Sequence, residues 1–143
     1  MLILLITQEP PLAPDAVATG NAIRTEQLVG ALQRAGHSIS HTWLDRSGSK
    51  HADAFHSRDE LKSTIIRQHP DAILVSYWEL LELLPFDLPQ PVIVDFVAPR
   101  PLEVLFEHPE RVRTELQRLQ SNLSKCDVML TGNRSQRDLL WFT

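Results

Sequence analysis

The sequence predicts an α/β fold with a Rossmann-like, three-layer, doubly wound parallel sheet of about five strands. Two observations support this prediction. Short apolar runs alternate with helical patterns along the 143 residues, which is typical of parallel strands joined by right-handed helical crossovers. Most of these runs carry few polar positions, so their strands are expected to be buried on both faces. We expect residues 1–143 to form one such domain.

The first half of the chain predicts two strands and two helices. The apolar run Leu2–Ile6 predicts the first strand, and a long Pro-rich loop separates it from a helix over 20–36. Residues 37–44 alternate between apolar and polar, which predicts a second strand near a sheet edge. The polar segment 45–56 predicts a surface loop. Residues 57–69 open with Ser-Arg-Asp-Glu, a capping-box pattern that predicts a helix.

The second half continues the alternation. Residues 71–76 predict a third strand, followed by a short leucine-rich helical turn that Pro85 ends. Residues 91–96 predict a fourth strand. Pro99 and Pro101 are expected to break the chain after it.

A long amphipathic helix is expected next. Pro109 suits its first position, and apolar residues recur along one stripe at intervals of four, three and four from Val112 to Leu123. Residues 127–131 predict a fifth strand, and Asn133 or Ser135 is expected to cap a last helix.

Composition excludes several classes of protein. The net charge of −4 lacks the basic footprint of a nucleic-acid binder, so we expect no nucleic-acid partner. The apolar start is too short to span a bilayer and lacks the features of a secretory signal. Cys126 is the single cysteine, which excludes an internal disulfide and is compatible with the reducing cytoplasm. We expect its thiol to be buried and structural.

Ligands of doubly wound sheets bind at the carboxyl ends of the strands. Gly20 lies there at the start of the first helix, where free backbone N–H groups favour a phosphate; its alternative role is simply to turn the chain. The sequence contains neither GxGxxG after the first strand nor a GxxxxGK[ST] motif. Phosphate binding therefore remains one of two hypotheses for Gly20.

Charged candidates lie at the same edge. Asp95 ends an apolar strand, where a general base or a hydroxyl acceptor would lie; alternatively it caps the following turn. Arg24, Arg100 and Arg134 are candidates to converge on an anionic group, since arginine makes bidentate contacts to phosphate. Each is otherwise an ordinary surface charge.

Tyr77 and Trp78 follow the third predicted strand and are candidates to stack on a sugar or a base; alternatively they form an aromatic pair at the edge of the core. The six histidines include His37 and His41 on one strand face, but there is no HExxH motif and no paired cysteine. We therefore expect no metal site and no cofactor.

Several segments resemble the N-terminal half of GT-B fold glycosyltransferases of the retaining, sucrose-synthase-like group. The resemblance runs over nearly the whole chain with loose motifs. The segments are Gly20–Leu28, Leu32–Ile39, Asp71–Val75, Val92–Phe96 and Cys126–Thr131, with the last preceding Asn133–Asp138.

The resemblance implies that residues 1–143 are the acceptor-side domain of a glycosyltransferase whose C-terminal donor-binding domain is absent. Such a domain would transfer a sugar from a nucleotide-sugar donor to an unknown acceptor only together with the second domain, and would be inactive alone. The resemblance implies that Gly20 faces the diphosphate and Asp95 the acceptor hydroxyl. The other implied substrate-binding residues are Asn21, Arg24, Tyr77, Trp78, Arg100, Asn133 and Arg134.

Two other hypotheses remain open. A non-catalytic, flavodoxin-like binding or regulatory module needs no second domain and predicts the lack of a catalytic signature. A protein-interaction module is the other hypothesis, because the apolar cluster Leu139–Phe142 is a candidate surface for a partner domain or chain.

Overall fold

The computed structural model describes residues 1–13, 15, 17–48, 51–97 and 100–141, with side chains as far as residue 138. Its elements alternate as the sequence predicts. In chain order they are β1 (Leu2–Thr7), α1 (Gly20–Arg34), β2 (Ser38–Leu44), β3 (Ala54–Phe55), α2 (Arg58–Gln68), β4 (Ala72–Ser76), η1 (Trp78–Leu83), β5 (Val92–Phe96), α3 (Arg100–Glu107), η2 (Pro109–Arg111), α4 (Val112–Leu123), β6 (Val128–Thr131) and α5 (Arg134–Trp141).

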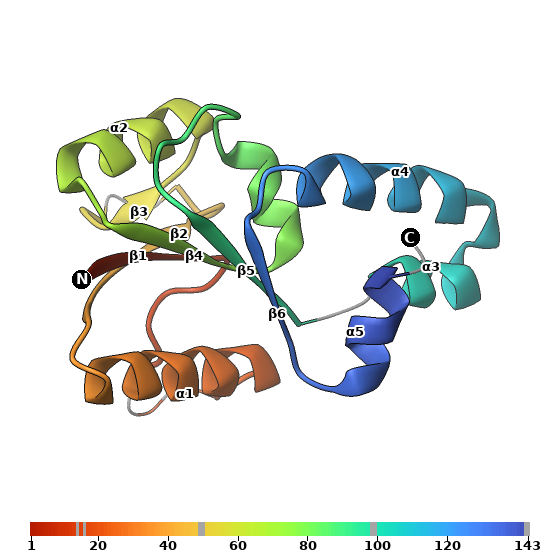
Figure 1. The fold of residues 1–143 in the computed structure, drawn as a ribbon, viewed down its shortest axis with the longest axis horizontal. Coiled ribbons are helices and arrows are strands. Elements are labelled where there is room, and N and C mark those ends of the chain that lie inside the picture. The colour runs from red at the N-terminus through yellow and green to blue at the C-terminus, as the bar shows by residue number, and fades with distance from the viewer. Residues whose placement is uncertain (14, 16, 49–50, 98–99, 142–143) are drawn as a thin grey trace.

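The strands form one six-stranded sheet in the order β3-β2-β1-β4-β5-β6 (Figure 1). All neighbouring strands pair in parallel, with Ile3 opposite both Ile39 and Ala72. This order is that of a doubly wound sheet, and it reverses between β1 and β4. The predicted fold class is confirmed.

Helices cover both faces of the sheet (Figure 1). On one face the even-numbered residues of β1 pack with α2, η1 and α4 in a large apolar cluster that includes Leu4, Trp78 and Leu119. On the other face the odd-numbered residues Ile3 and Leu5 pack under α1 in a smaller cluster. Because side chains alternate along a strand, each strand contributes to both clusters.

Four local predictions are corrected. The segment 45–56 contains the two-residue edge strand β3. The leucine-rich turn is the 3-10 helix η1, and Pro109 begins the short 3-10 helix η2 rather than α4 itself. Pro101 does not break the chain but occupies the second position of α3. A proline in the first turn of a helix loses no hydrogen bond, because the N–H groups there have no partner within the helix.

Two cations hold η1 in place. Lys125 Nζ donates to the carbonyl oxygens of Leu81 at 2.9 Å and Leu84 at 3.2 Å. Arg58 Nη2 donates to the carbonyl oxygens of Leu84 at 3.0 Å and Glu82 at 3.1 Å. The last carbonyls of a helix need donors from outside it. Arg58 and Lys125, called here the η1 clamp, therefore join α2 and the segment that follows α4 to η1. Burial and the charge of Arg58 lower the pKa of Lys125.

Among the described residues, none of the helices combines the length and apolar character needed to cross a membrane.

Candidate functional site

Three adjacent strands end in polar residues on the face covered by α1. They are Thr7 of β1, Ser76 of β4 and Asp95 of β5, exposed by 2%, 1% and 0%. Ser76 pairs with Asp95 in the register, and Thr7 is one position beyond the Ile6–Val75 pair. Side-chain alternation therefore brings all three to one line beneath the first turns of α1.

Helix α1 supplies the polar partners of this line. Asn21 and Thr25, both 7% exposed, lie one turn apart on its buried side. Ser76 Oγ donates to Asn21 Oδ1 at 3.4 Å and lies 3.4 Å from Thr25 Oγ1. We call Thr7, Asn21, Arg24, Thr25, Ser76 and Asp95 the polar layer. It fills the position where the strand order reverses, which is where doubly wound sheets usually bind ligands.

Arg24 and Asp95 form the strongest contact of the polar layer. Arg24 Nε donates to Asp95 Oδ2 and Nη2 donates to Oδ1, both at 2.6 Å. The Arg24 side chain is 31% exposed, whereas that of Asp95 is 1% exposed. The hydrogen bond to Asp95 raises the pKa of Arg24. Both oxygens of Asp95 are thus engaged, and the carboxylate has no access to a substrate hydroxyl.

The start of α5 also approaches Arg24. A Cβ atom on Gly132 would lie 3.4 Å from Arg24 Nη1 and 3.0 Å from Gln136 Oε1. Asn133 Oδ1 accepts the N–H of Gln136, so Asn133, one of the two predicted capping residues, caps α5. Arg134 is exposed in the first turn of α5. The sequence therefore identified several residues of one edge. Among the described residues, the ion pair of Arg24 and Asp95 joins two of these candidates, and the Tyr77 N–H donates to the Asp95 carbonyl oxygen at 3.4 Å.

The remaining candidates divide between the edge and other regions. Trp78 is 1% exposed and packs in the core, so it is removed from the candidate site. Arg100 lies on α3 and pairs with Glu103 at 3.0 Å and Glu107 at 3.6 Å. Gly20 is exposed, a Cβ atom added to it would have no neighbour within 4 Å, and its φ is ordinary, so no close approach requires glycine there.

Tyr77 remains at the edge and has unusual backbone geometry. Its φ of 88° is positive, a conformation that costs energy for any residue other than glycine. The residue follows β4 directly and is partly buried. Burial, followed by the charges of Glu9, Glu79 and Glu103, raises the pKa of the Tyr77 hydroxyl. Such strain is concentrated at functional sites, so Tyr77 stays a candidate.

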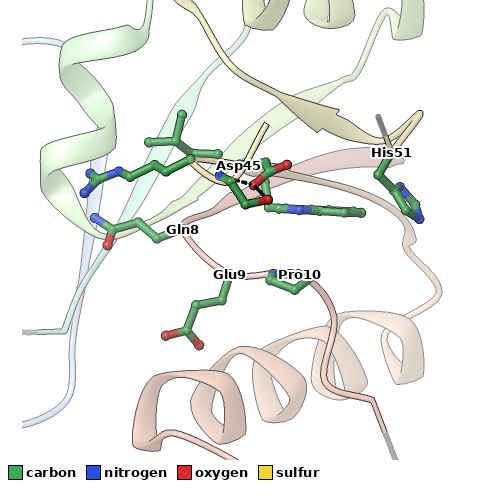
Figure 2. Close-up of a pocket in the computed structure, with 9 residues that line it drawn as sticks. Gln8, Glu9, Pro10, Asp45 and His51 are labelled. Carbon is green, nitrogen blue, oxygen red and sulfur yellow. Dashed lines mark hydrogen bonds between the residues drawn. The ribbon is translucent and has the colours of Figure 1, made fainter. Parts of the chain in front are cut away.

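A hollow of about 580 Å³ lies beside the polar layer, at the carboxyl ends of β1 and β2 (Figure 2). Figure 2 shows Gln8, Glu9 and Pro10 on one wall and Asp45 on the other, with His51 at one end. Asp45 Oδ1 accepts the N–H and the hydroxyl of Ser47, both at 2.7 Å, which shapes the second wall. The lining residues are Gln8, Glu9, Pro10, Trp43, Leu44, Asp45, Arg46, Ser47 and His51.

The sequence did not predict this hollow, because the pattern of residues 45–56 indicates a surface loop but not which residues that loop faces. Trp43, 8% exposed, contacts His51 at 4.6 Å between ring centroids and His41 at 5.9 Å. An aromatic residue near the end of the second strand, followed closely by an Asp-Arg pair, was the available signal. Trp43, His41 and His51 now replace Trp78 as the aromatic candidates for contact with a ligand.

Glu9 places a negative charge at the N-terminus of α1. Its Oε2 accepts the hydroxyl of Thr19 at 2.9 Å, and Thr19 Oγ1 in turn accepts the N–H of Ala22 at 3.0 Å. Thr19 is the N-cap of α1. A carboxylate at this position interacts favourably with the helix dipole and repels a phosphate that would use the same N–H groups.

His41 links β2 to the end of β1 as a neutral ring. Thr7 Oγ1 donates its one hydrogen to the carbonyl oxygen of Glu9 at 2.5 Å, so it must accept from His41 Nε2 at 2.7 Å. Burial lowers the pKa of His41 to about 4, with the charge of Asp53 acting in the opposite direction.

Acidification is therefore expected to destabilise the fold through His41. The pKa of an unperturbed imidazole is 6.5, whereas that of His41 in the folded chain is about 4. Between these values only the unfolded chain binds the proton, so the contribution of His41 to the free energy of unfolding is complete above pH 6.5 and is lost as the pH falls toward 4. Each pH unit is worth about 1.4 kcal/mol, and solvent screening of a partly exposed ring reduces the total to about 2 kcal/mol. Urea unfolding between pH 7 and pH 4 measures this loss.

His41→Gln is the control for that measurement, because glutamine retains a donor for Thr7 without titrating. Carboxylates that titrate in the same range affect both proteins equally. The two pH profiles should diverge below pH 6.5. Parallel profiles would show that His41 is not held neutral by the fold.

Other reactive groups are few in the part of the chain that is described. Within those residues there is no group of three His, Cys, Asp or Glu side chains that could hold a metal ion. Cys126 is partly buried, its thiol donates to the carbonyl oxygen of Leu123 at 3.2 Å, and burial raises its pKa. A raised pKa disfavours the nucleophilic thiolate.

The fold and this edge define an α/β domain with a doubly wound parallel sheet. No family model matches the chain, and no curated protein matches its sequence. A solved structure, the N-terminal domain of a response regulator receiver protein from Methanoculleus marisnigri JR1, is similar to it with 16% sequence identity and a TM-score of 0.45. That match covers 99% of this chain and 91% of the other.

The glycosyltransferase prediction is corrected. The solved structure named above is a domain of a response regulator receiver protein and not a GT-B domain, and no family model matches the chain. The geometry provides a physical reason: Asp95 is buried and bound by Arg24, and Glu9 occupies the helix end assigned to the diphosphate. The apolar cluster Leu139–Phe142 lies outside the side chains that the structure describes.

Proposed function

We propose that this chain is a non-catalytic, flavodoxin-like binding or regulatory module that works in the cytoplasm. Its ligand site is the hollow at the carboxyl ends of β1 and β2. The ligand is a small neutral molecule with a flat ring and several hydroxyl groups, and a nucleoside is the best match. The hollow itself is the observation that carries the proposal.

The size and position of the hollow support a small-molecule ligand. Its volume of about 580 Å³ lies within the range of about 300–1,000 Å³ that is usual for ligand pockets. It lies at the carboxyl end of β1, one of the two strands between which the sheet order reverses, and doubly wound folds bind ligands at the carboxyl ends of strands in this region. In such folds an acidic side chain after the second strand binds ribose hydroxyls, and Asp45 follows β2 directly.

The charges of the hollow support a neutral ligand. Glu9 and Asp45 place carboxylates on opposite walls of the hollow, and carboxylates are acceptors for the hydroxyl groups of a neutral ligand. Glu9 also repels a phosphate at the N-terminus of α1. Trp43 and Pro10 provide apolar surface for a ring.

The polar layer supports a binding role without catalysis. Arg24 and Asp95 neutralise each other at 2.6 Å, and neither oxygen of Asp95 is left without a hydrogen bond. A general base must reach the proton that it removes, and a carboxylate that is 0% exposed does not.

Calorimetric titration with adenosine, ribose and adenosine monophosphate tests the proposal. Adenosine is expected to bind more tightly than the monophosphate, because the phosphate meets Glu9. Asp45→Asn should weaken adenosine binding roughly tenfold, since it removes the charge from a hydrogen bond worth about 1.5–3 kcal/mol. Mass spectrometry of the incubated ligand should show no product.

Asp59→Asn is the matched control, because Asp59 is an exposed carboxylate on α2. It should bind adenosine as the wild type does. Absence of binding by all three probes, equal binding by the two variants, or tighter binding of the monophosphate would each contradict the proposed ligand. Conversion of adenosine would contradict the non-catalytic role.

A further inference from the structure

A second hollow, of about 500 Å³, adjoins the hollow described above, which is called here the first hollow. Ile39, His41 and Trp43 contribute to its wall, and they share one face of β2 because side chains alternate along a strand. The two hollows have Pro10, Trp43 and His51 in common. Pro10 and His51 are labelled in Figure 2. A ligand in the first hollow can therefore extend past Trp43 into the second.

The two hollows differ in the groups that they offer. The first is lined by the charged residues Glu9, Asp45 and Arg46, which suit the hydroxyl groups of a ribose. The second is lined mainly by aromatic rings and by apolar residues such as Pro11, with Asp53 as its charged residue. Flat aromatic and apolar surface suits a ring system. The base of a nucleoside therefore fits the second hollow while its ribose occupies the first.

His41 provides a hydrogen-bond acceptor on the wall of the second hollow. Its ring is neutral, and the one ring hydrogen is on Nε2, which donates to Thr7 Oγ1 at 2.7 Å. Nδ1 therefore carries a lone pair. Within the described part of the chain, no residue donates a hydrogen bond to Nδ1. This atom is complementary to an N–H group of a ligand and repels a carbonyl oxygen.

His51 provides a donor on the same wall. Its Nδ1 accepts the N–H of Asp53 at 3.3 Å, so the hydrogen of the neutral ring is on Nε2. The carboxylate of Asp53 lies 3.8 Å from His51 Nδ1 and adds negative charge, which favours a ligand group that donates. Adenine presents an amino group beside ring nitrogens that accept hydrogen bonds. Its pattern of donor and acceptors matches the pair of histidines.

We propose that the second hollow recognises the base of a bound nucleoside and selects a base that carries an exocyclic amino group, as adenine does. The amino group donates to His41 Nδ1, a ring nitrogen accepts from His51 Nε2, and the base lies against Trp43. This inference rests on the proposed function and defines its ligand class more closely. Inosine, in which a carbonyl oxygen replaces the amino group, is the ligand that the site rejects.

Calorimetric titration with adenosine and inosine tests the selection. Inosine should bind roughly tenfold more weakly, because its carbonyl oxygen faces the lone pair of His41 Nδ1 and the hydrogen bond is lost. Asp45→Asn should weaken the binding of both nucleosides by the same factor, since it changes only the ribose site. The ratio of the two affinities therefore reports on the second hollow alone.

His41→Phe tests the assignment of the acceptor, because phenylalanine keeps an aromatic ring and removes Nδ1. It should bring the affinities for adenosine and inosine to within about twofold of each other, since the hydrogen bond that separates them is gone. His108→Phe is the matched control and should keep the wild-type ratio, because His108 is exposed before η2 and lines neither hollow. Circular dichroism establishes that each variant is folded.

NMR of the wild-type chain tests the same assignment without a substitution. Long-range correlation of ring protons with ring nitrogens should show His41 with its hydrogen on Nε2 and a free Nδ1. Adenosine should shift the Nδ1 resonance of His41, and inosine should not. This measurement applies even if the phenylalanine variant does not fold.

The results distinguish failure of this inference from failure of the proposed function. Equal binding of adenosine and inosine by the wild type, or tighter binding of inosine, would overturn the base selection and leave the proposed function standing. An unchanged ratio in His41→Phe, or a His41 hydrogen on Nδ1, would overturn the role of His41. Absence of binding by both nucleosides would overturn the proposed function, and this inference with it.

Discussion

Replacement of Arg24 by methionine is expected to lower the free energy of unfolding by about 3–5 kcal/mol, the usual cost of removing one partner from a buried ion pair. Asp95 is 0% exposed and receives two hydrogen bonds from Arg24 at 2.6 Å. Methionine has a similar length but no donor, so the carboxylate would stay buried without its countercharge. Urea unfolding at pH 7 measures the loss.

The double variant Arg24→Met with Asp95→Asn separates this mechanism from simple loss of packing. Removing the buried charge as well should recover part of the stability, because the uncompensated carboxylate is gone. Arg100→Met is the matched control, since its ion pairs are exposed to solvent, where such pairs contribute little to stability. An Arg24→Met loss no greater than that of Arg100→Met would contradict the role assigned to the pair.

Lys125→Met is expected to lower the free energy of unfolding by about 2–3 kcal/mol. The substitution removes charge-assisted hydrogen bonds to the carbonyl oxygens of Leu81 and Leu84, and such bonds are worth about 1.5–3 kcal/mol. Arg58 still donates to Leu84, so the carbonyl of Leu81 loses most. Thermal and urea unfolding both measure the effect.

Lys62→Met is the control for the η1 clamp. Lys62 is an exposed residue of α2, and the same substitution there is expected to change stability by less than about 0.5 kcal/mol. The pair Arg58→Met and Lys125→Met should also be non-additive, because both cations share the carbonyl of Leu84. Equal losses for Lys62→Met and Lys125→Met would show that the clamp does not stabilise η1.

The strand and helix alternation could be predicted because each element is determined mainly by its own residues. The runs at β1, β4 and β5 are apolar on both faces, and Ser57 accepts the N–H of Glu60 as its capping-box pattern predicts. Helix α3 was not predicted, because Pro101 was expected to break the chain, as a proline in the interior of a helix does. In the first turn the same residue costs no hydrogen bond.

The candidate site was predicted only in part because it depends on distant segments. Asp95 and Arg24 were each placed at the correct edge, but they are 71 positions apart, and no local pattern indicates that they neutralise each other. The hollow needs the loop after β1 to face the loop after β2, which is a consequence of strand order. Trp78 was left with two alternatives, because an aromatic residue after a strand can face either the edge or the core, and its burial matches the second.

The all-parallel order of the sheet has a consequence for how the chain reaches its fold. Parallel neighbours cannot be joined by a hairpin. Two adjacent strands of this sheet can therefore pair only after the crossover segment between them has been synthesised. Ile3 of β1 meets Ala72 of β4 only after the intervening chain has been made. During synthesis β1 therefore stays without one of its two neighbours until more than half of this sequence has left the ribosome. Its apolar residues form an exposed, aggregation-prone segment in that interval.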